Sequence, residues 1–243
     1  MLFAPQPHRS FLPLMDDLEA WVSPALVPDV LNTDDAFVVA STVIERVSGT
    51  IATSVATGKI RFERDGFGGA PGLDYESNGS IILDHPIVDP GNGYSLYTAF
   101  HVSATPSASR GLAALHGGAG SSNQDGIWMD ILGAINARSG NSDLGAAVDY
   151  ADGAPHHVLV VVTPGDDQLL YVDRILKASA TGISQSAGMH RLTVGAAQDL
   201  APSWGTDGDG SRYIGDCMLY WAAHTSTAQR ERNWDYLERL YHF

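Results

Sequence analysis

The sequence predicts an all-β protein, an antiparallel β-sandwich closed by a single C-terminal helix. Short runs rich in β-branched and aromatic residues recur along the chain, and turn-forming residues separate them about every ten positions. One uninterrupted helical pattern stands at the end of the chain. The chain has 243 residues and no low-complexity linker or internal repeat. We therefore expect one large domain and not two small ones.

The beginning of the chain predicts an extended arm, residues 1–15. Prolines alternate there with large apolar residues: Phe3, Pro5, Pro7, Phe11, Leu12, Pro13 and Leu14. Proline holds the chain extended, and apolar side chains on a free tail need a surface to cover them. We expect the arm to become ordered against a neighbouring subunit, with residues 16–243 forming the sandwich domain. The segment Asp16–Val22 is expected to form a short helical turn.

The strands are expected in a regular series. The predicted segments are Ala36–Val39, Val43–Val47, Ile60–Phe62, Leu73–Tyr75, Ser80–Leu83, Tyr94–Val102, Leu112–Leu115, Ile127–Leu132, Ala146–Tyr150, His157–Thr163, Gln168–Asp173, Leu192–Ala196 and Tyr213–Trp221. Tyr94–Val102 shows the clearest alternation. His157–Thr163 is continuously apolar, as in a central strand covered on both faces. The turn Pro164–Asp167 joins it to the next strand as a hairpin.

The last segment predicts a helix that begins at Ser226. Ser226 and Gln229 have the spacing of a capping box, and no glycine or proline follows. Trp234, Leu237 and Tyr241 share one helical face, so this face should pack on the outside of the sandwich. Asp235 and Arg239 are spaced to form an ion pair on the other face.

Composition limits the classes of partner. The formal net charge is −14, Lys59 and Lys177 are the lysines of the chain, and no basic cluster is present. Such a chain should repel nucleic acid and anionic membranes. The single cysteine, Cys217, lies in an apolar strand and is expected to be buried. The first ten residues hold no signal peptide, and no apolar run is long enough to insert into a membrane, so we expect a soluble protein made in a cytoplasm.

Several segments resemble the concanavalin A-like (LamG-like) family in the expected order. Trp21 opens the domain, and Glu45–Gly49 stands where the family often has "W-x-D-x-S-G". The other matching segments are Gly69–Tyr75 ("G-x-P-G-L-x-F"), Tyr94–Phe100 ("Y-S-x-F-x-x-F"), Asp152–Val158 ("D-G-x-x-H-x-V"), Leu170–Asp173 ("L-Y-V-D-G", with Arg174 in place of the glycine) and the terminal Gly-Asp strand and helix. The resemblance spans about residues 20–243 and implies a jelly-roll sandwich.

The resemblance also implies a choice of functions. Family members are common in phage tail and capsid proteins and in adhesins, where they bind glycans or serve as structural modules. We expect a non-catalytic phage virion component, such as a tail fibre, spike or capsid decoration, that assembles with other virion subunits or as a homo-oligomer. It would be assembled in the host cytoplasm. The alternative is a glycan-binding adhesin or lectin-like module at a cell surface or outside the cell, and a polysaccharide-cleaving enzyme is third.

The carboxylates argue against catalysis. Glycoside hydrolases of this fold carry paired carboxylates at alternate positions of one strand. The six glutamates are Glu19, Glu45, Glu63, Glu76, Glu231 and Glu238, and no two share a strand at that spacing. His156 and His157 are adjacent on a strand, so they should face opposite ways and cannot hold one metal ion together. From these residues we expect no enzyme and no catalytic residues.

The candidate ligand-binding residues are aromatic and polar. Trp128 and Trp204 lie near loops that could share a rim, and an indole ring is a suitable platform for the face of a sugar; burial in the core is the alternative for both. Asp130 and Asn123 are the polar partners expected beside them. Asp207 and Asp209 are candidate calcium ligands, although a plain Asp-Gly turn explains them as well and the EF-hand pattern is absent. Beyond calcium, no cofactor is expected.

Overall fold

The computed structural model describes the greater part of the sandwich and the whole C-terminal helix. The described residues are 12–24, 37–38, 53–54, 59–76, 80–83, 93–116, 124–140, 142–183, 191–196 and 212–243. All statements below concern these residues. The expected strand at Val43–Val47 lies outside them, as do residues 1–11 of the expected arm.

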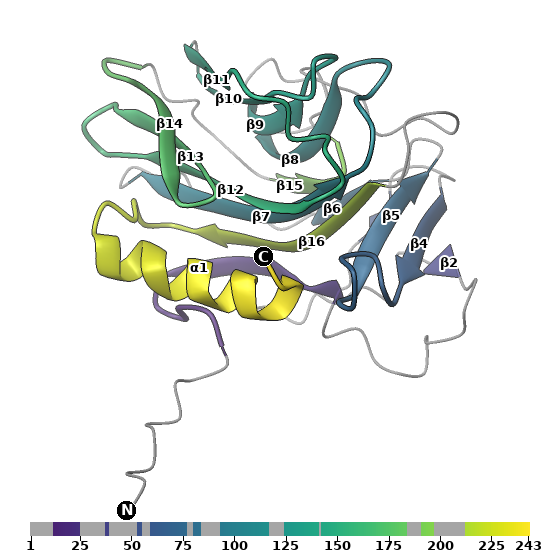
Figure 1. Cartoon of the computed structure of the whole chain (residues 1–243). Helices are drawn as coiled ribbons and strands as arrows, with labels where there is room; N and C mark the ends of the chain where they lie inside the picture. The colour runs from purple at the N-terminus through teal and green to yellow at the C-terminus, as the bar shows by residue number, and fades with distance from the viewer. Residues whose placement is uncertain are drawn as a thin grey trace, which may run out of the picture.

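Two antiparallel sheets make up the domain (Figure 1). The nine-stranded sheet has the order β14-β13-β12-β7-β16-β5-β4-β2, with β1 also paired to β16. Its strands are β1 (Leu18–Val22), β2 (Phe37–Val38), β4 (Lys59–Glu63), β5 (Gly72–Glu76), β7 (Tyr94–Val102), β12 (Pro155–Val162), β13 (Gln168–Val172), β14 (Ile175–Ala180) and β16 (Arg212–Tyr220). The seven-stranded sheet has the order β11-β10-β9-β8-β15-β6-β3. Its strands are β3 (Thr53–Ser54), β6 (Ile81–Leu83), β8 (Arg110–His116), β9 (Gln124–Met129), β10 (Ile135–Ser139), β11 (Ser142–Ala146) and β15 (Arg191–Val194).

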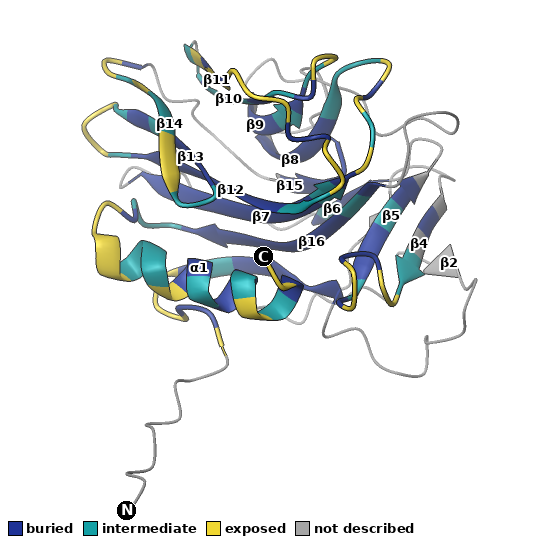
Figure 2. Ribbon diagram, viewed as in Figure 1, coloured by how far each residue is buried: buried dark blue, intermediate teal, exposed yellow. Residues whose placement is uncertain are grey.

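The main core fills the space between the two sheets. Leu96, Phe100 and Val102 of β7 point into it, as the alternation in the sequence predicts. Tyr97 and Ala99 point to the other side of the same strand and are also fully buried. A strand that is buried on both faces requires a third layer on the outside of its sheet. Figure 2 shows that buried residues follow β7 and β16, which lie between the helix and the second sheet.

That third layer is the helix α1 (Thr227–Tyr241) together with the segment around Leu14. Ser226 caps the helix by accepting a hydrogen bond from the Gln229 amide at 3.3 Å, which confirms the expected capping residue. Trp234, Leu237 and Tyr241 are buried against the outer face of the nine-stranded sheet, as expected. No helix among the described residues is long and apolar enough to cross a bilayer.

A buried carboxylate joins the helix to the sheet. Asp216 of β16 is fully buried and accepts four side-chain hydrogen bonds. The donors are Trp21 Nε1 at 2.7 Å, Ser23 Oγ at 2.7 Å, Tyr236 OH at 2.6 Å and Tyr241 OH at 2.5 Å. Burial raises the pKa of the Asp216 carboxyl, and the four hydrogen bonds oppose that rise.

The β13–β14 turn makes a second tie to the helix. Asp173 and Arg174 both have positive φ, at 49° and 65°, which is typical of a two-residue hairpin turn. The Arg174 guanidinium donates hydrogen bonds to three helix carboxylates: Glu231, Asp235 at 2.8 Å and Glu238 at 2.5 Å. The carboxylate of Asp235, which was expected to pair with Arg239, accepts from Arg174 instead.

Three expectations about local structure are wrong. Leu18–Val22 forms β1 and not a helical turn, because its partner β16 supplies a ladder of hydrogen bonds. The strands β3, β10, β11 and β14 were not anticipated. Of the expected strand Ala146–Tyr150, only Ala146 belongs to a strand.

The described end of the expected arm packs on its own chain. Leu14 is largely buried, its amide donates to Asn233 Oδ1 at 2.9 Å, and its carbonyl accepts from Tyr220 OH at 2.8 Å. An assembly role for residues 1–15 stays a prediction, since residues 1–11 lie outside the described part of the chain.

The first test concerns the helix face. Trp234 is 3% exposed and packs among the outer-face aromatics, so Trp234→Ala should lower the free energy of unfolding by about 3 kcal/mol or more. Arg239→Ala, at an exposed position of the same helix, should change it by less than about 0.5 kcal/mol. Urea melts of both variants measure this. Equal free energies of unfolding for the two variants would contradict the packing of α1 on the sheet.

The second test concerns Asp216. In Asp216→Ala the hydroxyl and indole donors of Trp21, Tyr236 and Tyr241 lose their common acceptor, so unfolding free energy should fall by about 3 kcal/mol or more. Asp216→Asn keeps one acceptor oxygen and should cost less. Asp65→Ala, on an exposed turn, is the control. A loss in Asp216→Ala no larger than in the control would show that the four hydrogen bonds contribute little.

Candidate functional site

The outer face of the seven-stranded sheet carries a partly exposed tryptophan. On β9, Ile127 and Met129 point into the core, so Trp128 between them points outward and is half-buried. On β10, Ile135 and Ala137 likewise point inward, and Asn136 and Arg138 point outward.

Strand register brings these outward residues into two neighbouring rows. Trp128 pairs with Gly111 on one side and with Asn136 on the other, and Asn136 pairs with Gly145. In the next row Arg138 lies between Gly126 and Asp143. Directly opposed side chains in antiparallel strands are about 5 Å apart, so the two rows form one continuous surface. We call this surface the Trp128 face; its members are Gly111, Gly126, Trp128, Asn136, Arg138, Asp143 and Gly145.

One glycine leaves the Trp128 face open beside Asn136. Gly145 is exposed and has no side chain, whereas Gly111 and Gly126 are buried. At Gly145, which is exposed, an added Cβ would lie 2.9 Å from Asn136 Oδ1. A larger residue there would therefore crowd the amide and cover part of the surface.

The polar groups of the Trp128 face are held in fixed orientations. Asn136 Nδ2 donates to Asp130 Oδ2 at 3.0 Å and to the Ala134 carbonyl at 3.1 Å. Within the described part of the chain Asn136 Oδ1 accepts no hydrogen bond. Arg138 makes a bidentate pair with Asp143, at 2.5 Å from Nε and 2.6 Å from Nη2, and the carboxylate raises the pKa of Arg138.

Asp130 shapes the turn beside this face. Its Oδ1 accepts from the amides of Leu132 at 2.8 Å and Ala134 at 3.1 Å, and its Oδ2 accepts from Asn136. Both carboxylate oxygens thus stabilise the β9–β10 turn and orient Asn136. A direct role for Asp130 in ligand binding stays a prediction.

The remaining predicted site residues cannot be placed relative to the Trp128 face, because they belong to segments outside the described part of the chain. Trp204, Asn123, Asp207 and Asp209 are outside the described residues, so their roles as ligand and calcium contacts stay predictions. Among the described residues no group of three histidine, cysteine or acidic side chains is arranged to hold a metal ion. Sequence reasoning missed Asn136 and Arg138, and the signal that could have found them is the alternation of apolar and polar residues in 135–138.

The adjacent histidines do face opposite sides of β12. His157 stacks on Trp234 beneath the helix. His156 lies near Phe100 and Tyr150 on the other face, with its Nδ1 2.8 Å from Asp173 Oδ2 and its Nε2 3.1 Å from Asp152 Oδ1. Burial lowers the pKa of His156, but the two carboxylates outweigh this and the net shift is upward.

No protein-family model matches the chain, and no curated protein matches it. Solved structures are similar in backbone. Trypanosoma rangeli sialidase in complex with the inhibitor DANA aligns with a TM-score of 0.62 and 11% identity over 91% of this chain and 33% of that chain. The binding domain of Paraclostridial Mosquitocidal Protein 1 gives 0.62 and 11% over 91% and 52%, and the botulinum neurotoxin serotype D binding domain gives 0.60 and 12% over 92% and 52%.

These likenesses confirm the fold that the sequence predicts, an all-β antiparallel sandwich of the concanavalin A-like kind with a C-terminal helix. The chain spans a third of the sialidase and about half of the toxin binding domains, so the likeness concerns the fold alone. The expectation from the carboxylates that the chain is not an enzyme is contradicted, because the similar solved structures include sialidases, which are enzymes.

A pH series tests the His156 contacts. Because the folded-state pKa of His156 is raised, its ion pairs stabilise the fold fully below about pH 6.5, the unfolded value, and this contribution is lost as pH rises through the folded value. The difference in urea midpoint between the wild type and His156→Gln should therefore shrink as pH rises. The exposed His242→Asn serves as the control. A difference that grows with pH would contradict the assignment.

Proposed function

We propose that the chain is a carbohydrate-binding β-sandwich module and that the Trp128 face is part of its binding surface. The observation that carries this proposal is the half-buried indole of Trp128, which points away from the core in one row with Asn136 and the exposed Gly145 and lies beside the oriented side chains of Asn136 and Arg138.

The chemistry of this face suits a sugar. A pyranose ring has a face of C–H groups that packs on an indole ring, and its hydroxyls both donate and accept hydrogen bonds. Asn136 Oδ1 can accept from a hydroxyl and Arg138 can donate to one. These groups lie in adjacent rows of the sheet, within reach of one or two sugar units stacked on Trp128.

Charge favours neutral or weakly charged glycans. Arg138 is neutralised by its bidentate pair with Asp143, so the face has no excess positive charge to attract an acidic polymer. The chain as a whole carries a formal charge of −14. Strongly anionic polysaccharides should bind less well for this reason.

The structural neighbours support the same class of function. One sialidase of this fold was solved with 2,3-difluorosialic acid, and the two toxin neighbours are binding domains. These properties belong to those proteins. They favour the lectin-like alternative over the virion component that the sequence suggested, and none of them concerns virions or homo-oligomers.

A glycan array with matched variants tests the proposal. Trp128→Ala should weaken binding to the best oligosaccharides by about tenfold or more, whereas Trp128→Phe should keep most of it. Ile175→Ala removes an exposed apolar side chain from another strand and should change nothing. Because Trp128 lies outside the core, the melting curves of all three variants should stay near the wild type. Unchanged glycan binding in Trp128→Ala would overturn the assignment of the face, and no binding to any glycan would overturn the function.

A further inference from the structure

Three large aliphatic side chains stand uncovered at one end of the sandwich. Ile131 and Leu132 lie in the β9–β10 turn and are 57% and 72% exposed, and Val148 lies in the loop that follows β11 and is 51% exposed. Leu132 is the most exposed large apolar residue in the described part of the chain. We call these three residues the apolar tip. Exposed apolar residues that gather at one place on a folded domain mark a contact surface.

Hydrogen bonds hold the two segments of the apolar tip together. The Tyr150 amide of the loop donates to the Gly133 carbonyl of the turn at 3.0 Å, and a Cβ added to Gly133 would lie 1.8 Å from Asp149 Oδ1. Within the turn, Asp130 Oδ1 accepts from the Leu132 amide at 2.8 Å. Tyr150 is buried in the main core and anchors the loop. The apolar side chains are thus displayed on a backbone that is fixed in place.

The apolar tip adjoins the Trp128 face. Leu132 follows Trp128 by four residues in the β9–β10 hairpin, so no more than about 14 Å separates their Cα atoms. Asp130 links the two, because its Oδ1 accepts from the Leu132 amide and its Oδ2 accepts from Asn136 Nδ2 at 3.0 Å. The tip lies at the end of the strands, whereas Trp128 points outward from the side of the sheet. A flat surface that touches the tip would therefore have the Trp128 face standing beside it.

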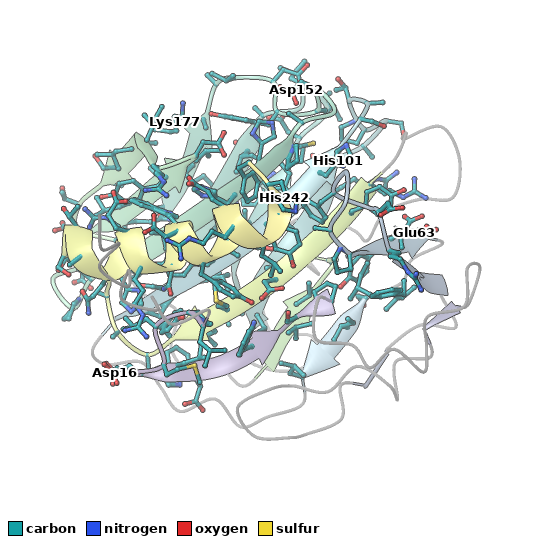
Figure 3. The ribbon with its side chains drawn as sticks, turned by 60° about the horizontal axis from the view of Figure 1, so that its bottom comes forward. Asp16, Glu63, His101, Asp152, Lys177 and His242 are labelled. Atoms are coloured by element: carbon teal, nitrogen blue, oxygen red, sulfur yellow. The ribbon has the colours of Figure 1, made fainter. Side chains whose placement is uncertain are left out.

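The charges around the apolar tip are mostly negative. Asp149 and Asp152 are exposed in the loop after β11, and Asp130 is partly exposed in the turn. Lys177 lies along the same edge of the molecule as Asp152, and Asp16 lies on the opposite side (Figure 3). Three carboxylates against one ammonium group leave an excess of negative charge at this end. An anionic surface would be repelled there.

The size of the apolar tip and its charge narrow the class of partner. Three aliphatic side chains on a turn present much less than the about 800 Å² that each partner of a stable protein complex buries. A second copy of the chain would bring like carboxylates together, and each copy has a formal charge of −14. A bilayer needs no matching pocket, since apolar side chains enter the boundary between its headgroups and acyl chains. A bilayer without net charge also avoids the repulsion.

We propose that the apolar tip inserts shallowly into the surface of an uncharged bilayer, so that the Trp128 face binds the glycans of neutral glycolipids in that bilayer. The glycan part of this inference rests on the proposed function, whereas the bilayer contact rests on the tip alone. Once the tip is bound, a glycan of the same bilayer is present at a high effective concentration. Two weak contacts then give firm binding to a glycolipid.

Vesicle flotation of the full chain tests the bilayer contact. The vesicles hold phosphatidylcholine alone, phosphatidylcholine mixed with phosphatidylserine, or phosphatidylcholine mixed with a ceramide that carries the neutral oligosaccharide ranked highest on the glycan array. Pure phosphatidylcholine should bind with an association constant below the about 10⁴ M⁻¹ of a single myristoyl chain. Phosphatidylserine should weaken this binding. The glycolipid vesicles should bind at least about tenfold more tightly than the same oligosaccharide free in solution.

Substitutions then locate the contact. Leu132→Ser and Ile131→Ser should each weaken binding to phosphatidylcholine about tenfold, because an aliphatic side chain no longer leaves water. Met15→Ser is the matched control, since Met15 is 47% exposed and lies next to Asp16 on the other side of the molecule. Trp128→Ala should keep the binding to pure phosphatidylcholine and lose the gain from the glycolipid. If one of the two tip variants fails to fold, as judged by its melting curve, the other carries the test.

A fluorophore gives an independent readout. The single cysteine, Cys217, is buried, so an environment-sensitive dye can be attached at Leu132→Cys alone. Phosphatidylcholine vesicles should shift the emission of the dye at Leu132→Cys to shorter wavelength. The same dye at Met15→Cys should not respond.

Four results would overturn the inference. They are no flotation of the wild type with phosphatidylcholine, flotation unaffected by the tip substitutions, tighter binding when phosphatidylserine is added, and a dimer without vesicles that Leu132→Ser dissociates. Glycan binding without flotation would leave the proposed function standing. Flotation that depends on the tip in a chain that binds no glycan would keep the bilayer contact and overturn the proposed function.

Discussion

The architecture depends on one buried carboxylate. Asp216 lies in the middle of β16 and collects hydrogen bonds from β1, from the residue that follows β1, and from two turns of α1. An isolated buried charge is unfavourable, so these donors and the carboxylate need one another. This mutual requirement fixes where the helix lies along the sheet and how it is rotated. A purely apolar contact would fix the position and the rotation of the helix less firmly.

The position of the helix decides which surfaces stay open. With α1 and the segment around Leu14 covering the outside of the nine-stranded sheet, the outer face of the other sheet is the one that remains for the Trp128 face. The candidate site is thus a consequence of how the nine-stranded sheet is covered.

The sequence predicted the elements that have strong local signals. β7 was predicted with its observed bounds, and the helix with its Ser226 cap, because strict alternation and a capping box are short-range patterns. β10, β11 and β14 are poor in large β-branched residues and owe their conformation to neighbouring strands. β1 was missed because its partner lies almost two hundred residues away in the chain. The site was predictable only in part: Trp128 stands out as an aromatic residue, but Asn136 and Arg138 join it through strand register, which the sequence does not reveal.

The pairing of β1 with β16 also has a kinetic consequence. Contacts between segments so distant in sequence must pay the entropy of closing nearly the whole chain before they give any stability. During synthesis, β1 and the outer faces of β7 and β12 have no cover until β16 and α1 have been made. The two sheets should therefore associate first, and the outer aromatic layer should form last and cooperatively, as the step that commits the chain to its native state.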